Sequence, residues 1–143
     1  MTTATTTEYV TIDGLKLSVK IAGKGRPFLF LHGLCGDALQ PLELFPDDAG
    51  WQCHALESRG HGGSEIGDMR ELSIRRLAQD ATAYLESLDR GPAVIGGVSM
   101  GAAIALRLTA DRPELAAGLV LGRPACCLLY TSSEPTRRSY IAY

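Results

Sequence analysis

The residues best suited to chemistry in this chain of 143 residues form the pentapeptide Gly97-Val98-Ser99-Met100-Gly101. An apolar segment precedes it and a segment with helical spacing follows it, so Ser99 is expected at a sharp turn between a strand and a helix. The small residues on either side allow the strand and the helix to approach closely. Such a turn strains the backbone of Ser99, raises its hydroxyl above the sheet and places it beside the first N–H groups of the helix. Ser99 is therefore the candidate nucleophile.

Two other interpretations of this loop remain open. The serine could serve only as the N-cap of the following helix. The glycine-rich stretch 96–101 could instead hold a phosphate, but Ala102 and Ala103 stand where a Walker motif has Lys and Ser or Thr. The glycine triplet of dinucleotide-binding loops is not formed either. The pattern favours the nucleophile turn over both alternatives.

Two further glycine-rich loops follow apolar segments earlier in the chain. They are His32-Gly33-Leu34-Cys35-Gly36 and Arg59-Gly60-His61-Gly62-Gly63-Ser64. With the pentapeptide around Ser99, these motifs occur in the order and spacing of the α/β-hydrolase family, which the chain resembles over Glu8–Ala125. The conjunction of three motifs is far more specific than any one of them.

The resemblance implies a serine hydrolase that acts on an ester, a lactone or a related acyl or carbon–carbon bond. It also implies an oxyanion hole made by the backbone N–H groups of Leu34 and Met100, next to the nucleophile Ser99. No cofactor is implied, and the expected partner is a small-molecule substrate.

The resemblance further assigns roles to the three histidines. His32 is expected to shape the oxyanion loop and not to act as the base, His61 to lie in a turn packed below the site, and His54 to be a core residue. A serine at position 99 excludes the branches of the family that use an aspartate nucleophile, such as the epoxide hydrolases.

The cysteines do not predict a disulfide framework, because the chain shows no secretion signal. They are Cys35, Cys53, Cys126 and Cys127. A zinc site built from His32, Cys35, Cys53 and His54 is the other possibility. Because Cys53 and His54 are neighbours in an expected strand, their side chains should point to opposite faces, so no metal site is predicted.

A serine nucleophile needs a histidine base and an orienting carboxylate, which follow the serine along the chain in this family. No histidine follows Ser99, and the only later carboxylates are Asp111, Glu114 and Glu134. We therefore expect the chain as given to be inactive. The alternative is a non-catalytic binding module of the same fold.

The last residues resemble no part of the hydrolase family. Residues 127–138 resemble the translation of a sequencing adapter, so we expect native sequence to end near Cys126 and 127–143 to be a non-native tail. In the family the strand expected at 117–121 is interior. Ending the sheet there would expose an apolar edge.

Hydrophobic periodicity then places these motifs on secondary structure. The expected strands are Glu8–Ile12, Leu15–Ile21, Phe28–Leu31, Trp51–Leu56, Ala93–Val98 and Ala117–Leu121, and the expected helices are Ala38–Phe45, Glu71–Asp89 and Met100–Ala110. The turn dipeptide Asp13-Gly14 joins the first two strands as a hairpin, and the second strand should bury one face. The fold class is α/β: the amino-terminal portion of an α/β-hydrolase fold, with an antiparallel edge hairpin followed by a doubly wound parallel sheet. A disordered lead-in is expected at 1–7 and the partial domain at 8–126.

Composition excludes several classes of protein. The chain is 45% hydrophobic with a formal net charge of −2, so it lacks the basic surface of a nucleic-acid-binding protein. Its apolar runs are too short to cross a membrane, and its first residues do not form a signal peptide. We expect a cytoplasmic protein without a membrane or nucleic-acid partner. The sequence leaves the oligomeric state undetermined.

Overall fold

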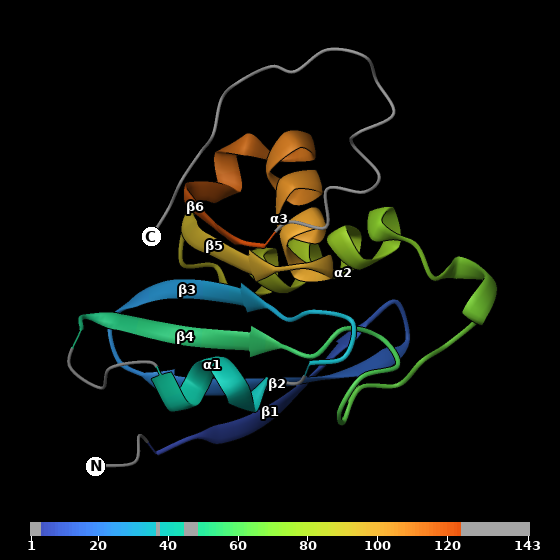
Figure 1. The fold of residues 1–143 in the computed structure, drawn as a ribbon, viewed down its shortest axis with the longest axis horizontal. Coiled ribbons are helices and arrows are strands. Elements are labelled where there is room, and N and C mark those ends of the chain that lie inside the picture. The colour runs from blue at the N-terminus through green and yellow to red at the C-terminus, as the bar shows by residue number, and fades with distance from the viewer. Residues whose placement is uncertain (1–3, 37, 45–48, 124–143) are drawn as a thin grey trace.

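A computed structural model describes residues 4–36, 38–44 and 49–123 of the protein. In these residues, six strands form one sheet in the order β1-β2-β4-β3-β5-β6 (Figure 1). The strands are β1 (Thr6–Ile12), β2 (Leu15–Gly23), β3 (Arg26–Leu31), β4 (Trp51–Leu56), β5 (Ala93–Val98) and β6 (Ala116–Gly122). The helices are α1 (Leu39–Leu44), α2 (Ile74–Leu88) and α3 (Met100–Asp111), with 3-10 turns at Met69–Glu71 and Pro113–Leu115.

The expected mixed architecture is confirmed. β1 and β2 form an antiparallel hairpin whose turn residues, Asp13 and Gly14, have φ angles of 49° and 79°, as the predicted hairpin turn requires. β2 pairs antiparallel with β4, and β4, β3, β5 and β6 are mutually parallel.

The disordered lead-in predicted at 1–7 extends too far along the chain, because its last two residues lie in a strand. Thr6 and Thr7 belong to β1, where they pair with Ile21 and Lys20 of β2. The Thr7 hydroxyl also accepts a hydrogen bond from the Lys20 ammonium at 3.2 Å. Pairing with a long second strand therefore orders a polar segment that has little to bury. Residues 1–3 and the predicted tail at 127–143 lie outside the described residues.

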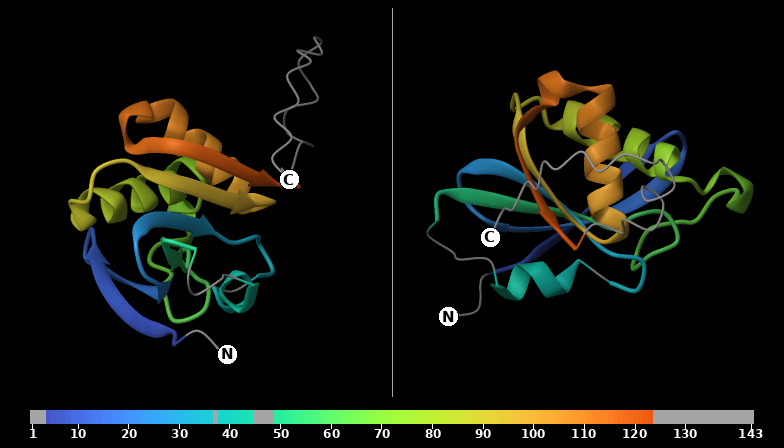
Figure 2. Two further views of the ribbon diagram at one scale, coloured as in Figure 1. Left: turned by 90° about the vertical axis from the view of Figure 1, so that its left-hand side faces the viewer. Right: turned by 45° about the horizontal axis from the view of Figure 1, so that its top comes forward.

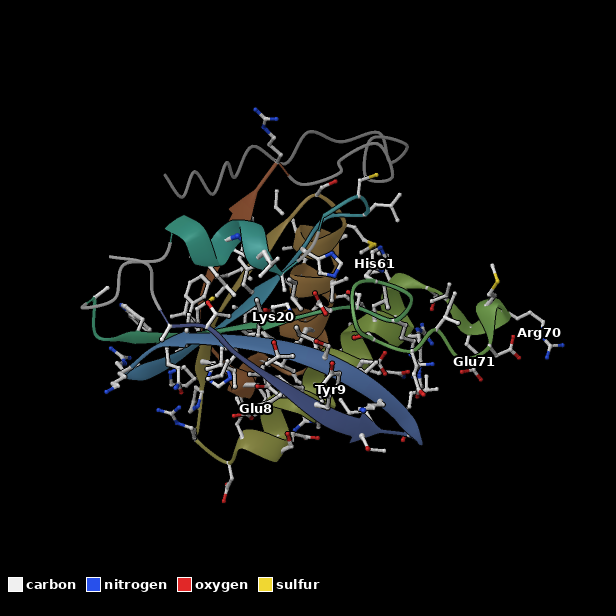
Figure 3. The ribbon with its side chains drawn as sticks, turned by 90° about the horizontal axis from the view of Figure 1, so that it is seen from below. Glu8, Tyr9, Lys20, His61, Arg70 and Glu71 are labelled. Carbon is white, nitrogen blue, oxygen red and sulfur yellow. The ribbon has the colours of Figure 1, made fainter. Side chains whose placement is uncertain are left out.

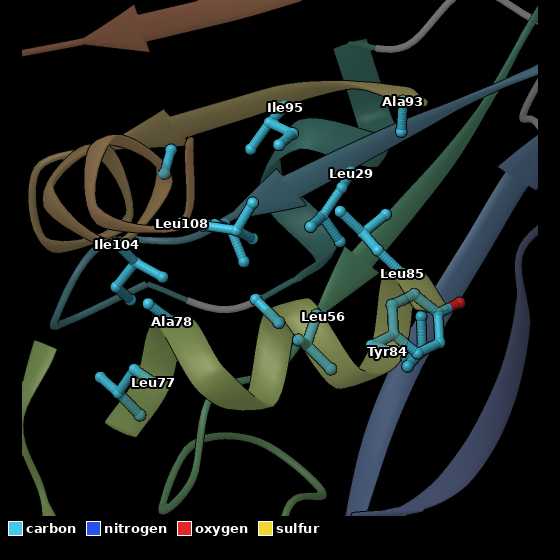
Figure 4. Packing of buried hydrophobic residues seen from close by; sticks show 14 of the residues in the cluster. Leu29, Leu56, Leu77, Ala78, Tyr84, Leu85, Ala93, Ile95, Ile104 and Leu108 are labelled. Carbon is cyan, nitrogen blue, oxygen red and sulfur yellow. The ribbon is translucent and has the colours of Figure 1, made fainter. Parts of the chain in front are cut away.

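Helices cover both faces of the sheet (Figure 2). Along β3, Phe28 and Phe30 pack into a small cluster with α1, whereas Leu29 and Leu31 belong to the larger core beneath α2 and α3 (Figure 4). This alternation explains why the segment is apolar throughout, since a parallel strand covered on both faces has no polar side. Among the described residues, no helix combines the length and apolar character needed to cross a membrane.

The second strand differs from the expected pattern of one buried face. Ser18 and Ala22 of β2 are buried as well, at 0% and 2% exposure. Ala22 packs into the cluster beneath α1. Ser18 is covered by the loop after β4, because its N–H donates to Ser64 Oγ at 2.8 Å and its carbonyl accepts from Glu57 N–H at 2.9 Å. The loop after β4 therefore covers part of the second face of β2. The hydrophobic periodicity of β2 itself does not indicate this cover.

Helix α2 is shorter than expected at both ends. Ser73 is its N-cap and accepts a hydrogen bond from the N–H of Arg76 at 3.1 Å, so the helix begins at Ile74. It ends at Leu88 because Asp89 adopts a left-handed conformation with φ 48°.

As predicted, Cys53 and His54 of β4 lie on opposite faces. Cys53 packs into the α1 cluster, and burial raises the pKa of its thiol to about 12. His54 faces α2, where its Nδ1 lies 2.7 Å from the Tyr84 hydroxyl and its Nε2 lies 3.1 Å from Gln52 Oε1. Burial, and then the positive charge of Arg90, lower the pKa of His54 to about 4.

This shift predicts a pH-dependent stability. Between pH 6.5 and about 4 the unfolded chain protonates His54 and the folded chain does not, so the contribution of His54 is present above pH 6.5 and declines toward pH 4. The loss is on the order of 3 kcal/mol. Urea unfolding at both pH values should show that wild type loses more of its free energy of unfolding than His54→Gln does. Parallel losses in the two proteins would contradict the assignment.

The β6 strand presents an apolar edge. Among the described residues only β5 pairs with it, and Val120 is 39% exposed. Unpaired strand edges favour association between chains, and a charged side chain opposes it. We expect this chain to self-associate and Val120→Lys to reduce the association measured by light scattering. Val120→Thr, which keeps the β-branch without charge, is the control. A wild-type chain that stays monomeric at high concentration would refute this expectation.

Candidate active site

Three loops meet at one edge of the sheet. They follow the carboxyl ends of the adjacent parallel strands β4, β3 and β5 and contain residues 57–64, residues 32–36 and Ser99 (Figure 1). β3 lies between the other two strands. The chain runs from β3 through α1, on one face of the sheet, to β4, and from β4 through α2, on the other face, to β5. In open α/β sheets, ligands bind at this reversal of strand order.

Ser99 joins β5 to α3 with the unusual backbone angles φ 54° and ψ −112°. A non-glycine residue in such a conformation carries a strain of about 1–3 kcal/mol. Its N–H donates to the Gly122 carbonyl of β6 at 3.0 Å, and its carbonyl accepts from the N–H groups of Ala102 and Ala103. The side chain makes no capping hydrogen bond to the helix. Ser99 therefore occupies the N-cap position without performing the capping role.

The flanking glycines show why this turn can form. A Cβ atom on Gly97 would overlap the Gly101 carbonyl, and one on Gly101 would overlap the carbonyl of Leu31 in β3. Backbone packs directly on backbone at both positions. The close approach of strand and helix predicted from the two small residues is present.

The loop after β3 lies against this turn. A Cβ atom on Gly33 would be in contact with Ser99 Cβ, at 3.5 Å. Leu34 follows Gly33, and its side chain points outward with 65% exposure. No described residue accepts a hydrogen bond from the N–H of Leu34 or of Met100. The three predicted site residues Ser99, Leu34 and Met100 thus come from two loops that touch each other.

His32 is buried beneath this loop with both ring nitrogens engaged. Its Nε2 accepts the Ser58 N–H at 3.0 Å, so the ring proton sits on Nδ1, which donates to the Gly33 carbonyl at 2.7 Å. A ring held in this way is neutral and has no nitrogen free to take a proton from Ser99. The geometry fits the loop-shaping role implied by the resemblance.

A buried ion pair supports the loop after β4. The Arg59 guanidinium donates to both carboxylate oxygens of Asp80 in α2, at 2.6 and 2.9 Å. Both residues are at most 3% exposed. Sequence reasoning missed this pair. The sequence does contain one indication of the pair. Asp80 is a charged residue on the apolar face of α2, beside Leu77, Ala78 and Ala81, where a buried carboxylate needs a partner.

Of the carboxylates that follow Ser99, the two that the structure describes do not complete a triad. Asp111 pairs with Arg107 at 2.7 Å and Glu114 pairs with Arg112, all at the surface. Asp111 is the last residue of the 12-residue helix that follows Ser99, so it lies about 18 Å away along the helix axis. Glu134 is outside the described residues.

Comparison with known proteins identifies the family of the chain. Residues 26–137 match the family model described as alpha/beta hydrolase fold. The chain belongs to the α/β-hydrolase fold family. It is 36% identical over 94 residues to the non-heme chloroperoxidase CPO-A1 of Kitasatospora aureofaciens, covering 64% of this chain and 34% of the relative. The chain spans 38–41% of the length of three curated relatives that it matches, two bromoperoxidases and a haloperoxidase by description.

Solved structures of other α/β-hydrolases superpose on it. Epoxide hydrolase VrEH1 from Vigna radiata matches with a TM-score of 0.76 and 27% identity, over 82% of this chain and 39% of that protein. Est816, described as an N-acyl homoserine lactone degrading enzyme, matches with a TM-score of 0.71 and 30% identity, over 80% of this chain and 44% of that protein.

The backbone contact at Gly101 predicts a sharp difference between two glycine substitutions. Gly101→Ala should destabilise the fold by about 3 kcal/mol or more, because the new methyl group collides with the backbone of β3. Gly118→Ala in β6 is the control, since its Cβ would make one ordinary contact, 3.5 Å from Val94. Thermal unfolding measures both. Equal melting temperatures for the two variants would contradict the inferred role of Gly101.

Proposed function

We propose that the protein is a serine hydrolase of the α/β-hydrolase family in which Ser99 is the nucleophile. The observation that carries this proposal is the strained conformation of Ser99, at φ 54°, with a hydroxyl that makes no capping hydrogen bond. A residue that served only to start a helix would have no need of either feature. Strain of this kind is retained where a side chain must be presented to a ligand.

The oxyanion hole is formed by the N–H groups of Leu34 and Met100. When Ser99 attacks an acyl carbonyl, negative charge gathers on the carbonyl oxygen. Two donors that have no acceptor among the described residues can stabilise that charge. Loss of one such donor costs roughly 3–4 kcal/mol of transition-state stabilisation. Met100 also lies at the amino end of α3, whose dipole favours negative charge.

The base and the acid of the triad lie in a part of the protein outside this sequence, and the chain is the amino-terminal portion of a longer hydrolase. Its coverage of only 38–41% of the first curated relatives supports this view. No histidine follows Ser99. Without a base the Ser99 hydroxyl is a weak nucleophile, so the 143-residue chain itself is inactive.

The substrate is a small molecule with an ester, a lactone or a related acyl or carbon–carbon bond, and no cofactor takes part. Similarity to Est816, described as a lactone-degrading enzyme, supports this class. Similarity to an epoxide hydrolase does not extend to its chemistry, since that branch uses an aspartate and position 99 is a serine. The net charge of −2 argues against a nucleic-acid partner, and we propose a cytoplasmic protein without a membrane partner.

A fluorophosphonate probe on the full-length protein tests the nucleophile. We expect covalent labelling of the wild type and none of Ser99→Ala. Ser87→Ala, which changes an exposed serine of α2, is the matched control and should label like wild type. The 143-residue chain should stay unlabelled.

The other outcomes are equally informative. Labelling that survives Ser99→Ala would exclude Ser99 as the nucleophile. A folded full-length protein that takes no label would favour the alternative, a non-catalytic binding module of the same fold.

A further inference from the structure

Two histidine rings lie together beneath the loop of residues 32–36. The ring centroids of His32 and His61 are 4.8 Å apart. His32 belongs to the loop itself, whereas His61 reaches it from the loop after β4 (Figure 3). The Nε2 of His61 lies 2.9 Å from the Leu34 carbonyl and its Nδ1 lies 3.0 Å from the Arg59 carbonyl. Carbonyl oxygens only accept hydrogen bonds, so the nitrogen facing Leu34 must carry a proton to bind it.

These contacts hold two successive peptide groups. The Gly33 carbonyl accepts from His32 Nδ1 and from the Gly36 N–H at 3.0 Å. In a planar trans peptide, a carbonyl fixed on one side directs the next N–H, that of Leu34, to the opposite side. The Leu34 carbonyl, held by His61, belongs to the following peptide group. Both planes that flank Leu34 are therefore tied, although its side chain is 65% exposed.

The His61 contact is anchored to the rest of the molecule. His61 follows Arg59 by two residues, with its Nδ1 3.0 Å from the Arg59 carbonyl, and the Arg59 side chain is fixed by the buried pair with Asp80 of α2. A neutral imidazole carries one ring proton, so a ring that donates from Nε2 to Leu34 makes no hydrogen bond from Nδ1. The support thus runs from α2 through the Arg59–Asp80 pair and the short segment 59–61 to the contact between His61 and the Leu34 carbonyl.

We propose that His61 is a positioning residue that holds the Leu34 peptide in the orientation of an oxyanion hole. The inference rests on the proposed hydrolase function and adds a residue to it. Because the oxyanion forms only in the transition state, a Leu34 N–H that points elsewhere lowers kcat and leaves substrate binding largely unchanged.

The test uses the full-length protein and an ester substrate. His61→Leu should lower kcat about 10-fold or more with KM within about 2-fold, because a small misplacement of a catalytic group has effects of this size. His61→Gln should recover most of the loss, because its amide N–H can take the place of Nε2–H. His54→Gln is the matched control, since His54 faces α2 and Tyr84, and should keep the wild-type kcat.

A direct measurement covers the case in which His61→Leu does not fold. The ring ¹⁵N spectrum of the folded wild-type protein should show a proton on His61 Nε2. An unprotonated Nε2 would overturn the proposal. So would a His61→Leu enzyme with wild-type kcat, or an equal loss in His61→Gln and His61→Leu.

The outcomes separate this inference from the function on which it rests. If Ser99→Ala abolishes turnover and His61→Leu retains it in full, the positioning role is wrong and the hydrolase function stands. If turnover does not depend on Ser99, both are wrong.

Discussion

Direct contact between backbones at Gly97 and Gly101 is the constraint on which the candidate site depends. Neither position has room for a Cβ atom, because the carbonyls of Gly101 and Leu31 already occupy that space. The amino end of α3 consequently sits against β3 and β5 with no side-chain layer between them. Ser99 alone connects the strand to the helix, and this sharp turn gives it a φ angle of 54°. Strain at one residue is maintained by packing that the rest of the sheet supplies.

The loop after β4 is held by a different kind of interaction. Arg59 and Asp80 are charged groups removed from water, and such a pair contributes little net stability because desolvation offsets the attraction. Its two parallel hydrogen bonds, however, define one geometry between α2 and the loop. Losing either partner would leave a buried charge without its hydrogen-bonded counter-charge, at a cost of about 3–5 kcal/mol. The pair thus specifies position more than it adds stability, and the loop it positions carries His61.

Sheet topology explains why these supports converge. β3 lies between β4 and β5, so the loop of residues 32–36 is flanked by the Arg59 loop on one side and by Ser99 on the other. Parallel strands bring their carboxyl ends to one edge, and groups far apart in sequence become neighbours there. The contact between His61 and the Leu34 carbonyl spans 27 residues of sequence, and that between Gly33 and Ser99 spans a longer separation.

The sequence by itself determined those features that depend on residues close together along the chain. The strands Trp51–Leu56 and Ala93–Val98 have the predicted bounds, and the turn at Ser99 follows from the small residues beside it. Runs of apolar residues, glycines and turn dipeptides act over a few residues, so a local pattern reports them. The family resemblance rested on the same kind of signal, because each of its motifs is a short loop.

Tertiary structure alone decided the long-range pairings. In the sequence, Asp80 is one charged residue of a predicted helix and His61 is a residue of a predicted turn. Only the structure shows that Asp80 binds Arg59 and that the His61 ring contacts the Leu34 carbonyl. The covered second face of β2 and the pairing of Thr6 and Thr7 have the same origin. Hydrogen bonds between distant segments depend on how the chain is routed through the sheet. Residue types along the chain do not record that routing, so these partners could be read only from the fold.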